Sequence, residues 1–309
     1  MRERAQEFFN NDPFFGSAMI CGLVAGVIGL IYLGNAGAPM TMILVNGLTL
    51  TIGLLLALVL RVTLRLEPKT LTAIALGSTL LLLGTALVGH GIEGANRWLP
   101  IGPYVLQPSL ILLPIVAICY AHRSNLWNSL AVIGSVAAMA IQPDRAMAGM
   151  LLACTLLLSF AKPSNGRFTV SLFCAVTFVV TMMIPDNLTA VPFVDHILWT
   201  AFDINLVIGM SLWAGCLLLL APVLLVSREN RQSVHWVFGA GWLAVMASAA
   251  FGAYPTPIVG FGASAILGYF LSLVVVEPKP HLVPDEGEED VTKKAQQDTS
   301  KIDLLPVTV

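Results

Sequence analysis

Long apolar runs follow one another along most of this chain and constrain its fold more than any other feature. The runs fall at about residues 16–35, 40–61, 70–90, 108–121, 126–141, 145–161, 168–184, 197–226, 234–252 and 257–276. A helix needs about 20 apolar residues to cross a bilayer, and only helices and closed barrels satisfy their backbone hydrogen bonds there. The sequence therefore predicts an all-α, polytopic membrane protein with about ten transmembrane helices.

The composition agrees with this class of protein. Hydrophobic residues make up 57% of the 309 residues and charged residues only 11%, whereas soluble domains carry about 25% charged residues. A net charge of −2 without a basic cluster gives no support for nucleic-acid binding. The five cysteines lie in separate apolar runs without a C-x-x-C or Cys/His cluster. We therefore expect them to be core residues rather than metal ligands or disulfide partners.

Three regions follow from the distribution of polar residues. Residues 1–15 mix two arginines with four phenylalanines and are expected to form a cytoplasmic interfacial segment. Residues 16–276 form the predicted ten-span membrane domain, and no A-x-A-like site follows its first run, so that run should stay as an anchor. Residues 277–309 are polar and charged and are expected to be a disordered cytoplasmic tail. The acidic run from Asp285 to Asp290 is either a solvated segment or a docking element for a partner.

The lysines and arginines predict the orientation in the membrane. If the N-terminus is cytoplasmic, fourteen of the 16 basic residues fall on the cytoplasmic side, and only Arg97 and Arg145 fall outside. Such an excess of basic residues on one side marks the cytoplasmic face. We therefore expect both termini in the cytoplasm and the segment Gly91–Ser109 on the outer side.

The segment Gly91–Ser109, with the sequence GIEGANRWLPIGPYVLQPS, is a polar, turn-rich stretch between two apolar runs. Its glycines and prolines rule out a continuous helix. Burial of Glu93 or Arg97 in hydrocarbon would cost several kcal/mol, so the segment is expected at an interface or beside a wet cavity. Trp98 and Tyr104 are the aromatic residues expected at the level of the lipid headgroups.

The predicted outer side collects further polar residues. Besides Gly91–Ser109 they are His90, Gln142, Asp144, Arg145, Asp186, Asp195, His196, Asp203, Tyr254 and Ser264. Carboxylates, arginines and helix ends at this boundary suit an amphiphilic substrate with an anionic head and a tail in lipid. No GxGxxG, Walker A or GxSxG pattern occurs, so nucleotide-driven transport and serine hydrolysis have no support.

Asp195 is the best candidate for a general base. It precedes an apolar helix in which Asp203 follows eight residues later, about two helical turns on and on roughly the same face. The alternative is that Asp195 is a helix N-cap, worth about 1 kcal/mol, and Asp144 before another apolar run has the same alternative. Arg97 could pair with Glu93 or bind phosphate through its planar guanidinium.

Four motifs stand in these outer loops in order. They are GANRWLPIG at 94–102 followed by Gln107-Pro108-Ser109, then Gln142-Pro143-Asp144, then Asp195–Gly209, and finally PIVGFGAS at 257–264. They resemble the G-x-x-R-W-…-Q-P-S-E loop, the Q-P-D motif, the helix that opens with the catalytic aspartate and the P-F-I-S-Y-G-G-S motif of one family. This is the SEDS family (shape, elongation, division, sporulation) of RodA/FtsW-type peptidoglycan polymerases. The resemblance covers essentially the whole predicted membrane domain.

The chain departs from the family pattern at several positions. The family's Glu after Q-P-S is Leu110 here, and a Lys a few residues later is lost. The T-D before the catalytic helix is Val194-Asp195, and a Glu-Glu pair is replaced by Asp203-Ile204. The aspartate is retained, while part of the family's polar cavity is not.

The resemblance implies a peptidoglycan glycosyltransferase of the bacterial inner (cytoplasmic) membrane, acting in cell-wall synthesis for shape, elongation or division. The implied substrate is lipid II, the undecaprenyl-pyrophosphate-linked disaccharide peptide, polymerised at the outer face. Asp195 would be the catalytic base, and the substrate-binding residues would be Arg97, Trp98, Gln107, Asp144, Asp203 and Ser264. A class B penicillin-binding transpeptidase is the implied partner. No metal-ligand set or cofactor is expected, although a divalent cation could offset the pyrophosphate charge.

Two other functions stay open on the sequence. Leu110 and the lost lysine favour a catalytically reduced relative that acts as a scaffold or lipid II-binding protein in a cell-wall or division complex. A lipid-linked precursor transporter is the third alternative. It would need polar residues at the middle of the membrane, where most of these runs contain Leu, Ala, Val and Ile.

The predicted orientation can be tested by cysteine labelling of intact cells. Ala95→Cys and Ala190→Cys should react with a membrane-impermeant reagent added outside, because both positions fall in predicted outer loops. Leu64→Cys, Asn165→Cys and Glu229→Cys should react only after permeabilisation. Labelling of Asn165→Cys from outside would overturn the predicted orientation and the outer location of the motifs.

Overall fold

The computed structural model describes residues 13–64, 66–92, 95–102, 104–185, 189–227 and 229–276. The predicted interfacial segment, apart from residues 13–15, and the predicted tail lie outside the described residues. The helices are α2 (Pro13–Asn35), α3 (Met40–Thr63), α4 (Pro68–Val88), α5 (Pro108–His122), α6 (Leu126–Ile141), α7 (Arg145–Ala161), α8 (Asn165–Met183), α9 (Ile197–Thr200), α10 (Leu206–Leu218), α11 (Ala221–Leu225), α12 (Ser233–Phe251) and α13 (Ala263–Val276). The predicted all-α, polytopic membrane fold is confirmed.

The helices differ in how far they can reach across a bilayer. Among the described residues, α2, α3, α4, α8 and α12 have at least 18 residues and are apolar enough to cross a membrane by length and composition. The apolar helices α5, α6, α7, α10 and α13 are shorter, with 10–17 residues. Together these ten helices fall on the ten predicted runs in the same order.

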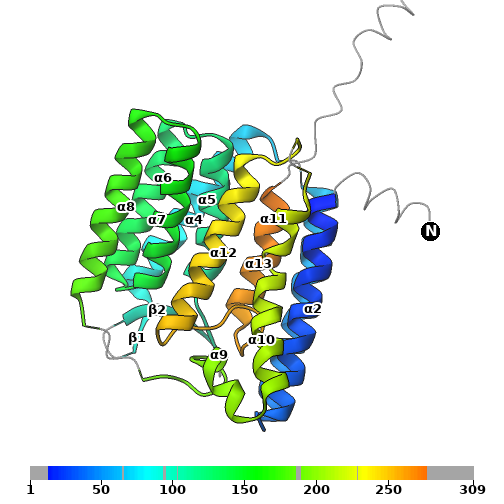
Figure 1. Ribbon diagram of the computed structural model, residues 1–309. Helices are drawn as coiled ribbons and strands as arrows, with labels where there is room; N and C mark the ends of the chain where they lie inside the picture. Colours follow the sequence, from blue (N-terminus) through cyan, green and yellow to red (C-terminus); the bar gives the residue numbers. More distant parts are fainter. Residues whose placement is uncertain are drawn as a thin grey trace, which may run out of the picture. The chain divides into compact units, whose positions relative to one another are not determined.

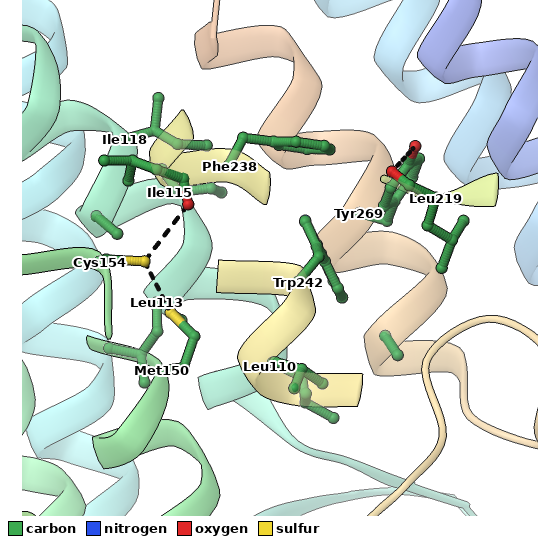
Figure 2. Close-up of a cluster of buried hydrophobic side chains, with 14 of the residues drawn as sticks. Leu110, Leu113, Ile115, Ile118, Met150, Cys154, Leu219, Phe238, Trp242 and Tyr269 are labelled. Atoms are coloured by element: carbon green, nitrogen blue, oxygen red, sulfur yellow. Dashed lines mark hydrogen bonds between the residues drawn. The ribbon is translucent and has the colours of Figure 1, made fainter. Parts of the chain in front are cut away.

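Helices α5, α12 and α13 form the centre of the helix bundle (Figure 1). Helix α5 packs against α4 and α13, α12 packs against α7 and α5, and α13 packs against α3. An apolar cluster joins the central helices (Figure 2) and includes Leu110, Leu113, Met150, Cys154, Phe238, Trp242 and Tyr269. All five cysteines are buried with free thiols, so their prediction as core residues is confirmed.

The eighth predicted span, 197–226, is not one continuous helix. Helix α9 is followed by a short 3-10 helix, η1 (Ala201–Asp203), and a new helix, α10, begins at Leu206. The side chain of Asn205 accepts a hydrogen bond from the backbone N–H of Ile208 at 2.9 Å and so caps α10. An asparagine that satisfies a free N–H in this way favours the start of a new helix over continuation of the old one.

The segment before α5 forms a small antiparallel sheet rather than an irregular loop. Strand β1 (His90–Ile92) pairs with β2 (Ala95–Ile101), and β2 pairs with β3 (Tyr104–Leu106) through Leu99↔Leu106 and Ile101↔Tyr104. Gly102 turns the chain between β2 and β3 with a φ of 60°, a conformation that glycine adopts without strain. The prediction that this segment cannot be a helix is confirmed, whereas its strands were not predicted.

Four connections gather at one end of the bundle, which we call the sheet end. They are the sheet itself, the α6–α7 turn at 142–144, the turn at 191–196 before α9 and the α12–α13 loop at 252–262. Figure 1 shows β1, β2 and α9 together at this end. The four sequence motifs therefore meet in space, because each lies in one of these connections or at the adjoining helix end.

Candidate functional site

Arg97 of β2 ties the sheet to two other connections at the sheet end. Its side chain is only 3% exposed. The Nε atom donates a hydrogen bond to the Gln142 carbonyl at 3.2 Å, and Nη2 donates to the Pro143 carbonyl. The guanidinium also lies 5.9 Å from the ring centre of Trp98 and 5.8 Å from that of Tyr254. Arg97 is therefore held in the protein by carbonyl groups and aromatic rings, which are favourable partners for a buried guanidinium.

Asp144 joins two of the sequence motifs from a fully buried position. Its Oδ1 accepts a hydrogen bond from the Met147 N–H at 3.2 Å and caps α7. Its Oδ2 accepts from Gln107 Nε2 at 3.0 Å and from the Ser109 hydroxyl at 2.9 Å. The alternative role as a helix cap is thus confirmed for Asp144. The same carboxylate also binds Gln107 and Ser109 at the start of α5. It therefore fixes the α6–α7 turn and the start of α5 relative to each other from a buried position.

Gln107 extends this set of hydrogen bonds to the last motif. Its backbone N–H donates to the hydroxyl oxygen of Ser264, at the start of α13, at 2.8 Å. Gln142 is also fully buried, and its Nε2 donates to the Leu82 carbonyl at 3.0 Å. We call Arg97, Gln107, Ser109, Gln142, Asp144 and Ser264 the motif cluster. It unites three of the four motifs, as the sequence predicted from their shared location.

Two polar oxygen atoms in the connections at the sheet end have no hydrogen-bond partner among the described residues. They are Oε1 of Gln142 and the hydroxyl of Thr256, both in side chains that are at most 1% exposed. An unpaired buried polar group costs about 1–3 kcal/mol and calls for an explanation such as ordered water or a functional role. The α6–α7 turn and the α12–α13 loop therefore each contain a buried polar group that the packing of the helices does not explain.

Asp195 differs from Asp144 because its side chain is only half-buried. It lies in the turn 191–196, and its Oδ2 accepts a hydrogen bond from the Val191 N–H at 2.8 Å. Helix α9 begins after His196, which is its N-cap residue and has a φ of 58°. The alternative prediction that Asp195 caps this helix is therefore wrong. Its carboxylate is positioned by the turn through the bond to Val191, and the residue as a whole is half-buried.

The α12–α13 loop connects Asp195 to the motif cluster. The Thr256 N–H donates to the Val194 carbonyl at 3.1 Å, and the Phe261 N–H donates to the Phe193 carbonyl at 2.8 Å. Both acceptors lie within two residues of Asp195. The same loop carries Tyr254, which contacts Arg97, and leads into Ser264. The α12–α13 loop therefore positions the turn of Asp195 and also contacts the motif cluster.

Several other predicted residues lie apart from this arrangement or cannot be placed. Asp203 is exposed and belongs to η1, so the prediction that it shares one helical face with Asp195 is wrong because the helix breaks before Asn205. Arg145 donates to the Ile184 carbonyl at 2.7 Å and so holds the end of α8. Glu93 and Asp186 lie outside the described residues, as does any pairing of Glu93 with Arg97.

Leu110 stands where the resembling family has a glutamate, and it is part of the apolar core. It is 4% exposed and belongs to the cluster that Figure 2 draws together with Trp242 and Leu113. Helix α13 packs closely here, since a Cβ added to Gly268 would meet the Leu110 carbonyl. The described His, Cys, Asp and Glu residues form no group of three or more that could hold a metal ion. A divalent cation near the substrate stays a prediction from the sequence.

The motif cluster can be tested through the stability of the protein. Asp144→Ala removes the cap of α7 and two further hydrogen bonds to a carboxylate, each worth about 1.5–3 kcal/mol, so the melting temperature in detergent should fall strongly. Asn125→Ala is the control because it removes only the cap of α6, a bond of 2.8 Å worth about 1 kcal/mol. Equal losses in the two variants would show that Asp144 is a cap and nothing more.

Comparison with known proteins finds a shared fold. No family model matches the chain, and no curated protein matches its sequence. The chain is similar to the rod shape determining protein RodA of Thermus thermophilus, with a TM-score of 0.60 and 20% identity over 84% of this chain and 94% of that one. An aspartate-to-alanine variant of that protein gives a TM-score of 0.63 at the same identity and coverage.

A third similar structure belongs to a peptidoglycan synthase complex whose description concerns the coordination of polymerization and crosslinking. It gives a TM-score of 0.57 and 20% identity over 84% of this chain and 96% of that one. These likenesses extend over nearly the whole of the similar chains. The resemblance to the SEDS family that the motifs indicate is thereby confirmed at the level of the fold.

Proposed function

We propose that this SEDS-type membrane protein is a peptidoglycan glycosyltransferase that polymerises lipid II. The observation that carries the proposal is the half-buried residue Asp195, connected through the α12–α13 loop to a buried cluster of motif residues. Asp144 is enclosed and shares its oxygens among three donors, so it has a supporting role. Asp195 is only half-buried, and a general base must lie where a substrate can reach it.

In the proposed reaction, Asp195 accepts the proton of the acceptor sugar's 4-hydroxyl. The hydroxyl oxygen forms a bond to the anomeric carbon of the donor sugar as the bond from that carbon to undecaprenyl pyrophosphate breaks. The pyrophosphate leaves with the electron pair, and Asp195 later releases its proton to solvent. General-base assistance of this kind contributes about 10²–10⁴-fold to a rate.

Arg97 supports this reaction from within the wall of the site. Its donors to the Gln142 and Pro143 carbonyls fix the sheet, and its positive charge favours an anionic headgroup nearby. Trp98, Gln107, Asp144 and Ser264 are proposed to shape the binding site in the same way, by holding the connections together. Asp203 lies on an exposed turn, where contact with a bound substrate is a separate proposal.

The location and partner belong to the same proposal. The charge distribution of the sequence supports cytoplasmic termini and a sheet end at the outer face of the bacterial inner membrane. A class B penicillin-binding transpeptidase is the proposed partner, and lipid II is the proposed substrate. The similarity to a chain of a complex that coordinates polymerization and crosslinking supports a partner that performs crosslinking.

A second function is favoured by one observation. Leu110 and its neighbours make the region of the family's glutamate an apolar core, so a polar part of the family's site is absent at this position. A scaffold that binds lipid II without polymerising it would need the headgroup site and not the base. The two functions differ in whether purified protein makes glycan.

The proposed role of Asp195 predicts a specific loss in Asp195→Asn. The amide oxygen can still accept the Val191 N–H, so expression and melting temperature should stay close to wild type, while polymerisation of labelled lipid II should fall at least about 100-fold. Asp203→Asn, on an exposed turn, is the matched control and should retain more activity. Polymerisation that survives Asp195→Asn would contradict the proposal. Wild-type protein that binds lipid II but makes no glycan with or without the transpeptidase would support the scaffold.

The apolar surroundings of Leu110 predict the outcome of restoring the family residue. Leu110→Glu would place a carboxylate among buried apolar side chains, so we expect a lower melting temperature and no gain in polymerisation. Leu110→Met keeps a similar side-chain volume, so the free energy of unfolding should fall by less than about 1.5 kcal/mol. Higher activity of Leu110→Glu without loss of stability would show that water reaches this position.

A further inference from the structure

Asn46 of α3 is a buried polar side chain in a largely apolar helix. It is 1% exposed and lies outside the four motifs. A polar side chain inside a membrane protein is costly unless its hydrogen bonds are satisfied, and such residues are kept where they hold helices together or serve function.

Both ends of the Asn46 amide bind the backbone of the α12–α13 loop. Its Nδ2 donates to the Gly260 carbonyl at 2.8 Å, and its Oδ1 accepts from the Gly262 N–H at 3.2 Å. The two contacts bracket Phe261 on either side. A primary amide offers a donor and an acceptor side by side, so one side chain fixes both the position and the orientation of this loop segment.

The bracketed residue contacts the turn of Asp195. The Phe261 N–H donates to the Phe193 carbonyl at 2.8 Å, two residues before Asp195. Asn46 is thus linked to the turn of the proposed base through the loop segment Gly260–Gly262. On its other side the loop leads to Ser264, whose hydroxyl accepts the Gln107 N–H.

The loop has a conformation that needs such a restraint. Ile258 in the loop has a φ of 64°, and Phe193 in the turn that the loop contacts has a φ of 65°. Both values are unfavourable for residues with bulky side chains. Ile258 is 1% exposed, and a Cβ added to Gly29 of α2 would lie 2.8 Å from the Val259 carbonyl oxygen. Strained backbone of this kind persists where the surroundings fix it, and it gathers at functional sites.

We propose that Asn46 is a positioning residue for Asp195, acting through Gly260–Gly262 and the Phe261–Phe193 hydrogen bond. It touches neither the reacting sugars nor Asp195 in this scheme. Its effect on catalysis rests on the proposed function, whereas its hold on the Asp195 turn does not. The two parts can therefore be tested separately.

The test compares Asn46→Leu with Thr79→Val in the full-length protein. Asn46→Leu keeps a similar volume and removes both contacts to the loop. Thr79→Val is the matched control, because Thr79 is also buried and its hydroxyl lies 2.9 Å from the Ala131 carbonyl and the Ser135 hydroxyl, between α4 and α6. Both variants should lose stability. Asn46→Thr, whose hydroxyl is too short to make both contacts, gives an intermediate variant if Asn46→Leu fails to fold.

The first readout is amide hydrogen exchange in detergent. The amides of Thr256, Phe261 and Gly262 should exchange faster in Asn46→Leu than in wild type. In Thr79→Val their exchange rates should be the same as in wild type. The second readout is lipid II polymerisation, in which kcat of Asn46→Leu should fall about 100-fold with little change in KM, as for a misplaced catalytic group. Thr79→Val should keep its kcat.

Two results would overturn the inference. One is unchanged exchange at these three amides in both Asn46 variants. The other is an equal loss of kcat in Thr79→Val, since stability alone would then explain the effect. If wild-type protein makes no glycan, the proposed function has failed, and hydrogen exchange still decides whether Asn46 holds the Asp195 turn.

Discussion

The hydrogen bonds of buried polar groups at the sheet end are the constraint on which the rest of this structure depends. An apolar bundle has few partners for a carboxylate or a guanidinium, so each one must find them locally. Asp144 satisfies three donors, and Arg97 binds two carbonyls and two aromatic rings. Because their partners come from different connections, satisfying these groups also brings together the sheet, the α6–α7 turn and the α12–α13 loop, and backbone hydrogen bonds from that loop hold the turn at 191–196.

This arrangement separates positioning from chemistry. The motif cluster is almost fully enclosed and holds the ends of the helices, while Asp195 lies in a turn and is only half-buried. The α12–α13 loop connects the motif cluster to the turn of Asp195 through backbone hydrogen bonds at Thr256 and Phe261. A preorganised base of this kind loses little entropy when a substrate arrives, which suits catalysis at a membrane surface.

The sequence predicts those features that depend on local pattern. Apolar runs indicate the helices, and the motif residues Arg97, Gln107, Asp144 and Ser264 are correctly expected to gather at one end. The eighth span is predicted wrongly because the capping of α10 by Asn205 competes with continuation of an apolar helix. Asn46 is not found at all, because its partner Gly260 lies 214 residues away and no local pattern indicates that contact. A lone asparagine in an apolar span is the one signal that could have marked it.

The assignment of Asp195 as the base is tested most directly by a cryo-EM structure of the protein in nanodiscs with lipid II bound. We expect the sugar headgroup to lie against the Asp195 carboxylate, with Arg97 still donating to the Gln142 and Pro143 carbonyls and Asp144 still bound to Gln107 and Ser109. A headgroup bound away from Asp195 would contradict the assignment of the base. A headgroup held directly by Asp144, with its bonds to Gln107 and Ser109 broken, would contradict the separation of positioning from chemistry.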